Sequence, residues 1–135
     1  MPIAYLPEGY REFSLDQLGP FLAENYARGT LRVQVFSAQG VFPVPDAVIE
    51  DSAVLDGTVL PLYRRYTDES GIADDMILPT KPKIDSQREE TAADSGALYL
   101  VNVSHPQYQP LTDHTVVIYD GIETIYPALM FPRIA

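Results

Sequence analysis

The chain contains no cysteine among its 135 residues. It can therefore form no disulfide bond, thiolate zinc site or iron–sulfur cluster, and it offers no cysteine nucleophile. Basic residues are also scarce: nine lysine and arginine residues stand against nineteen acidic ones, for a formal net charge of −10. A surface of that charge repels a phosphate backbone, and only Lys81 and Lys83 supply lysine, so we expect no nucleic-acid partner.

Long apolar runs are missing as well. No stretch approaches the roughly 20 apolar residues that a membrane-spanning helix needs. The first residues, MPIAYLPE, have neither the basic start nor the apolar stretch of a signal peptide. We therefore expect no membrane span; either the chain stays in the cytoplasm, or it is one domain of a longer protein, or it leaves the cell without a classical signal.

Groups suited to catalysis or metal binding are sparse. His105 and His114 are the only histidines, and their separation does not match the short spacings of zinc sites. No glycine-rich phosphate loop is present. The acidic pairs Asp68-Glu69 and Asp74-Asp75 leave open a weak calcium site in a loop. The sequence therefore predicts no catalytic, cofactor-binding or metal-ligating residue and no cofactor, and an enzyme of unknown type is the least favoured alternative.

What is present divides the chain into two parts. Ser14 and Gln17 stand at capping-box spacing, and apolar residues recur there at helical spacing, at Leu15, Leu18, Leu22 and Tyr26. Gly29 suits the end of such a helix. We expect residues 1–28 to form an N-terminal extension with a short helix, and residues 29–135 to form one domain.

From Thr30 onward the apolar period changes to two, which is typical of half-buried strands. Seven strands are expected, near residues 31–36, 44–49, 58–66, 72–78, 98–103, 115–119 and 123–131. Turns are expected at Asp56-Gly57 and at Thr67–Gly71, and residues 80–96 should form the most mobile loop. This pattern predicts a mainly β, seven-stranded antiparallel sandwich. Its expected core includes Leu31, Val33, Val35, Val101, Val103, Val116 and Ile118.

Several short motifs occur in a recognisable order. They are GTLRVQV from Gly29, PVPDAVI from Pro43, TDESGI from Thr67, and YLVNV from Tyr99, which is followed by HPQYQP. This order resembles the carboxypeptidase regulatory-like domains, which have a transthyretin-like (prealbumin-like) sandwich. The closing VIYDGI and LMFP motifs are similar to domains of this type in clostridial cell-wall and spore-cortex proteins. Where that family has a glycine in its second motif, this chain has Asp46.

The resemblance implies a fold without a catalytic set. We therefore expect a non-catalytic accessory or interaction domain associated with a bacterial envelope, cell wall or spore. A structural subunit of a phage-like particle or surface assembly is the main alternative. The expected contact surface combines Asp68 and Glu69 of one turn with His105, Gln107 and Tyr108 of a loop, because these side chains offer contact area with polar tips. The partner is expected to be a protein, or peptidoglycan or another glycan.

Overall fold

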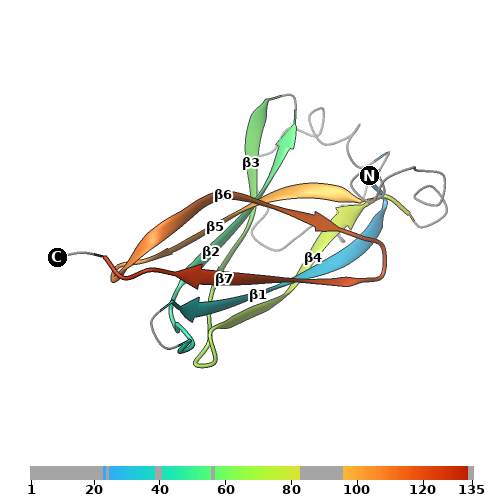
Figure 1. The fold of residues 1–135 in the computed structure, drawn as a ribbon. Helices are drawn as coiled ribbons and strands as arrows, with labels where there is room; N and C mark the ends of the chain where they lie inside the picture. The colour runs from blue at the N-terminus through green and yellow to red at the C-terminus, as the bar shows by residue number, and fades with distance from the viewer. Residues whose placement is uncertain (1–22, 24, 39–40, 56, 83–95, 134–135) are drawn as a thin grey trace.

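In a computed structural model the chain folds into two β-sheets packed face to face (Figure 1). The structure describes residues 23, 25–38, 41–55, 57–82 and 96–133. The strands in chain order are β1 (Ala27–Ser37), β2 (Val48–Leu55), β3 (Thr58–Tyr66), β4 (Ile72–Thr80), β5 (Ala97–His105), β6 (Tyr108–Ile118) and β7 (Glu123–Met130). The prediction of a mainly β sandwich with seven strands is confirmed.

One sheet has the strand order β4-β1-β7 and the other has the order β3-β2-β5-β6. Every pairing is antiparallel except that of β1 with β7, which run parallel. Strands β6 and β7 are consecutive in the chain but lie in different sheets, so the turn between them joins the two layers along one side. The Thr124 hydroxyl strengthens this side by donating to the Val117 carbonyl at 2.8 Å.

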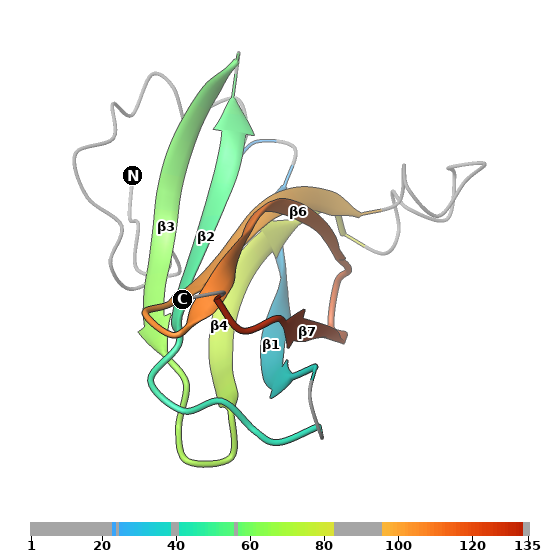
Figure 2. The ribbon, with the colours of Figure 1, turned by 60° about the vertical axis from the view of Figure 1, so that its left-hand side comes forward.

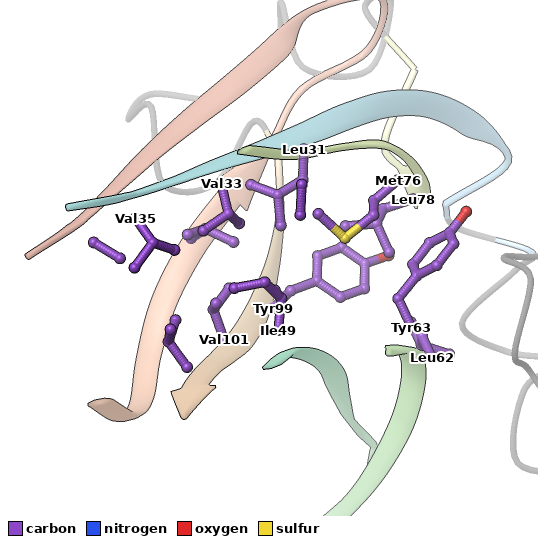
Figure 3. Packing of buried hydrophobic residues seen from close by; sticks show 14 of the residues in the cluster. Leu31, Val33, Val35, Ile49, Leu62, Tyr63, Met76, Leu78, Tyr99 and Val101 are labelled. Carbon is purple, nitrogen blue, oxygen red and sulfur yellow. The ribbon is translucent and has the colours of Figure 1, made fainter. Parts of the chain in front are cut away.

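The core fills the space between the two sheets, and Figure 3 shows its side chains meeting there. Alternate residues of β1 are buried, as its period of two requires. The ring of Tyr99 lies beside Met76 and Leu78, so a β5 side chain fills the centre of the interior (Figure 3). All seven residues predicted for the core are buried: Leu31, Val33, Val35, Val101, Val103, Val116 and Ile118.

Hydrogen bonds from side chains also connect the two sheets near β4. The Tyr99 hydroxyl donates to the Pro79 carbonyl at 2.5 Å, and the Thr80 hydroxyl donates to the Ile118 carbonyl at 2.5 Å. The Tyr63 hydroxyl accepts from the Ile77 N–H at 2.9 Å and donates to the Ile77 carbonyl at 3.1 Å. These bonds satisfy polar groups at the strand ends and edges of the sandwich, which would be costly to leave unpaired.

The β2–β3 hairpin extends beyond the sheet that carries it, at the top of Figure 2. Strand β2 pairs with β5 only over Val48–Ser52, whereas its pairing with β3 continues to Leu55. A bulge between Asp51 and Ser52 marks the point where the two ladders diverge. Gly57 has a φ of 79° and occupies the predicted turn, where only glycine adopts this conformation without strain.

Three local expectations need correction. Gly29 does not end a helix, because β1 begins at Ala27 and Gly29 lies within it. A Cβ there would lie 2.2 Å from the Tyr119 carbonyl oxygen, so close packing explains this glycine. Strand β2 begins at Val48, four residues later than expected, and β6 begins at Tyr108, seven residues earlier than expected, so β6 includes His114. Most of the expected helix, from Ser14 to Tyr26, and most of the expected mobile loop, residues 80–96, lie outside the described residues.

Candidate functional site

Four connecting segments meet at one end of the sandwich. The strand register brings them together, because Val48 pairs with both Tyr66 and Ser104. The end of β3, the start of β2 and the end of β5 are therefore neighbours. We call the surface formed by residues 41–47, 67–71, 105–108 and 131–133 the loop end. It occupies the lower half of Figure 2.

Backbone hydrogen bonds tie these segments to one another. The Asp46 N–H donates to the Thr67 carbonyl, and the Thr67 N–H donates to the Ala47 carbonyl. On the other side, the Gln109 N–H donates to the Phe131 carbonyl, and the Arg133 N–H donates to the Gln107 carbonyl. These bonds join the segments in two pairs, and the pairing of Val48 with both Tyr66 and Ser104 places the turn and the loop chosen from the sequence at the same end of the molecule.

Thr67 supports this surface from beneath. Its side chain is buried, and its hydroxyl donates to the Val44 carbonyl at 2.7 Å. The same oxygen accepts the Ala47 N–H at 2.9 Å. One hydroxyl therefore satisfies two backbone groups of the irregular segment that leads into β2, and so fixes that segment against the β3–β4 turn.

The Asp68 carboxylate accepts hydrogen bonds from the backbone of its own turn. One carboxylate oxygen accepts the Ser70 N–H at 2.9 Å and the Ile72 N–H at 3.0 Å. Asp68 thus bonds the backbone two and four residues on, and Gly71 has a positive φ of 75°, so the turn expected at Thr67–Gly71 is present. Glu69, like Asp68, is exposed in this turn.

His105, Gln107 and Tyr108 form a compact loop. The His105 Nδ1 accepts the Gln107 N–H at 3.1 Å, and the His105 and Tyr108 rings meet edge to face with centroids 5.2 Å apart. Tyr108 is half-buried and packs against the core, whereas Gln107 is exposed. Tyr108 therefore holds the loop in place, and Gln107 and the edge of His105 remain available for contact.

Sequence reasoning missed the most exposed aromatic residues of this end. Phe42 is 66% exposed and Phe131 is 56% exposed, and both directly precede a proline within or beside the loop end. Tyr66, the last residue of β3, is 61% exposed. Phe42 lies outside the expected strands and Phe131 is the last residue of one, and the proline that directly follows each phenylalanine was the signal that could have found them.

The other histidine lies on the side of the sandwich where the two sheets join. His114 Nδ1 is hydrogen-bonded to the Tyr126 hydroxyl, and the two rings meet edge to face. Burial raises the pKa of Tyr126. Within the part of the chain that the structure describes, no three histidine or acidic side chains are grouped closely enough to hold a metal ion. Asp74 and Asp75, considered for calcium, are exposed on β4.

One acidic residue, Asp51 on β2, was not singled out from the sequence. Its side chain is 0% exposed, and neither carboxylate oxygen has a hydrogen-bond partner among the described residues. Burial raises the pKa of Asp51 to about 7, although the positive charge of Arg65 lowers it. Burial, followed by the negative charge of Asp51, also raises the pKa of Tyr99. Asp51 lies within the interior and away from the loop end, so it is not part of the candidate surface.

The comparisons with known proteins concern the fold. No family model and no curated protein matches the sequence. Among solved structures, the chain is similar to the Bacillus anthracis TIE protein, with a TM-score of 0.55, 15% identity and 78% of this chain covered. It is also similar to catechol 1,2-dioxygenase from an Acinetobacter species (TM-score 0.52, 13% identity, 80% covered). A third match is 3-chlorocatechol 1,2-dioxygenase from Rhodococcus opacus (TM-score 0.52, 16% identity, 78% covered).

These similarities are limited in scope. The chain spans 17% of the TIE protein and 53% and 60% of the two dioxygenases, which is less than two thirds of each. At identities of 13–16% they establish a shared sandwich fold and no shared activity. No helix among the described residues has the length and apolar character needed to cross a membrane.

Proposed function

We propose that this chain is a non-catalytic binding module that holds a glycan of the bacterial cell wall or spore at its loop end. The observation that carries the proposal is the convergence of four segments at one end of the sandwich, where Phe42 and Phe131 are exposed and Tyr66 is exposed at the adjoining end of β3. Scattered exposed apolar residues are ordinary, but aromatic rings gathered at one end of a monomer are a feature of binding surfaces.

The chemistry of the loop end favours a carbohydrate. Aromatic rings can stack on the apolar faces of sugar rings, and Gln107 and His105 add polar groups for hydroxyls beside them. The net charge of −10 disfavours anionic polymers but leaves neutral or basic sugars. The resemblance to carboxypeptidase regulatory-like domains of cell-wall and spore-cortex proteins supports the same partner.

Binding of peptidoglycan fragments tests the proposal. We expect Phe42→Ala and Tyr66→Ala each to weaken binding by about tenfold, which corresponds to about 1.4 kcal/mol of lost contact. Tyr26→Ala is the matched control, because Tyr26 is 58% exposed but precedes β1 at the opposite end. Tyr108 is a poor probe, since its half-buried ring also supports the loop. Equal binding by all three variants, or no binding by the unmodified protein, would refute the glycan site.

A structural subunit is the second candidate. The outer face of the β4-β1-β7 sheet exposes three large apolar residues, Ile77, Ile125 and Leu129. On this face Phe36 is paired with Leu129, and Arg32 is paired with Ile125. A second copy of the chain is the occupant we assign to this face. Sedimentation of the unmodified protein and of the Ile125→Lys variant separates the two functions. A monomeric glycan-binding module gives the same sedimentation coefficient for both proteins, whereas a self-associating subunit gives a smaller coefficient for Ile125→Lys.

A further inference from the structure

Asp51 is an acidic side chain enclosed in the interior of the sandwich. Its cross-strand neighbours are Tyr63 on β3 and Val101 on β5, both buried, so its carboxyl faces the core. Asp51 lies immediately before the β2 bulge and one residue before the end of the β2–β5 ladder. Beyond that point, β2 is paired with β3 alone.

Few charged or titratable groups surround this carboxyl in the described part of the chain. Strand β3 contributes Tyr63 and Arg65, and the Arg65 guanidinium lies 4.7 Å from the centre of the Tyr63 ring. Strand β5 contributes Tyr99, whose hydroxyl donates to the Pro79 carbonyl and not to Asp51. Glu50, next to Asp51 on β2, is exposed.

The facing sheet offers mainly apolar side chains to this interior. Strands β1 and β4 present Leu31, Val33, Met76 and Leu78, all buried. On the β7 side, the titratable group is Tyr126, whose hydroxyl is hydrogen-bonded to His114 of β6. The described surroundings therefore provide Asp51 with no hydrogen-bond donor and with one basic residue, Arg65. An ionised carboxylate buried there loses its hydration and gains no hydrogen bond in exchange. The free-energy cost of burying the neutral acid is much smaller.

The direction of the pH effect follows from this asymmetry. Burial raises the pKa of Asp51 from 3.8 to about 7, with Arg65 opposing the shift. Between these two values the folded chain holds a proton that the unfolded chain has lost. Stability therefore falls as the pH rises from about 4 to about 7 and is not further changed by this group above that range.

We propose that Asp51 is a proton switch built into the core. With its carboxyl protonated, β2 packs against the facing sheet. Loss of the proton loosens the β2–β3 hairpin at the bulge beside Ser52. The hairpin is the element expected to respond because its outer part is held by β2–β3 pairing and lacks the β5 ladder.

Chemical unfolding of the full chain across pH tests this switch. From pH 5 to pH 8.5, Asp51 should increase the unfolding equilibrium constant by about a hundredfold. Asp51→Asn, which cannot ionise, should remove that increase, and Asp51→Leu provides a second uncharged side chain if the amide impairs folding. Asp74→Asn is the matched control, because Asp74 is exposed on β4 and should leave the pH dependence unchanged. Comparing variants also cancels the contributions of His105 and His114.

Two further measurements separate a proton switch from a merely structural role. At pH 5.5 the infrared carbonyl band of a protonated carboxylic acid should be stronger in the unmodified protein than in Asp51→Asn, and this difference should be lost as the pH rises through about 7. In Arg65→Gln the band should persist to higher pH, since Arg65 favours ionisation. Amide hydrogen exchange should accelerate in β2 and β3 more than in β1 above pH 8. An unchanged pH profile in both Asp51 variants, or no protonated carboxyl band at pH 5.5, would overturn the proposal.

Discussion

Single residues in left-handed backbone conformations shape the loop end. Gly71 has a positive φ, and a Cβ there would lie 2.5 Å from the Val35 carbonyl oxygen, so both conformation and space demand glycine. Asp46 has a φ of 60° although it carries a side chain. Its side chain makes no hydrogen bond in the described part of the chain. Asp46 therefore holds a mildly strained conformation.

We predict that Asp46→Gly raises the free energy of unfolding by about 0.5 kcal/mol, because glycine adopts a positive φ without the Cβ penalty. Gly71→Ala should do the opposite and cost more than about 1 kcal/mol, since the new methyl group meets the Val35 backbone. Urea unfolding of the two variants beside the unmodified chain checks both signs. A loss of stability in Asp46→Gly would show that the aspartate makes a stabilising interaction of its own.

Among the strands, β4 has an exposed edge, and the side chain of Tyr63 bonds the backbone there. Strand β4 ends its sheet, so Ile77 would present a free N–H and carbonyl to a neighbouring chain. The Tyr63 hydroxyl reaches across from β3 and bonds both groups. The same ring lies beside Arg65. One side chain therefore links the two sheets along this side and covers an edge that could otherwise pair with another molecule.

We predict that Tyr63→Phe lowers the free energy of unfolding by about 1–2 kcal/mol, because two hydrogen bonds are lost while the ring stays in place. The bare edge at Ile77 should also increase association at high concentration. Tyr66→Phe is the control from the same strand, because Tyr66 is exposed and its hydroxyl can bond water. Urea midpoints and light scattering measure the two effects. Equal midpoints in both variants would mean that the Tyr63 bonds add no net stability.

At the scale of the whole molecule, acidic charge dominates. With a net charge of −10 on 135 residues, repulsion among the chain's own carboxylates opposes the compact state. The burial of apolar side chains from all seven strands between the two sheets offsets this repulsion. Salt should therefore stabilise the fold by screening.

We predict that the melting temperature at pH 8 rises by a few degrees between about 20 mM and about 0.5 M sodium chloride, because the Debye length shortens severalfold. Near the isoelectric point of about 4.4 the same salt change should have little effect, since the net charge is then close to zero. Differential scanning calorimetry at the two pH values makes the comparison. A salt effect of equal size at both would point to specific ion binding in place of screening.

The sequence by itself determined the local features of this protein. The period of two from Thr30, the turn at Thr67–Gly71 and the buried set around Val33 and Val101 could be predicted, because each depends on neighbours in the chain. The same reasoning selected His105 and Tyr108, and the loop that they form is present. Strand starts were less accurate, because tertiary pairing extends or shortens a strand beyond its local pattern.

Tertiary structure decided what depends on register between distant strands. The local pattern did not indicate that β1 pairs with β7 in parallel. It also did not indicate that Val48 pairs with both Tyr66 and Ser104, and this pairing places the two predicted loops at one end. Asp51 shows the same limit most clearly. The mixed apolar and acidic sequence around Asp51 is compatible with a strand in which its side chain faces either the core or solvent. Only the packing of one sheet against the other places its carboxyl inside, because a shift of one residue in register reverses which side chains are buried.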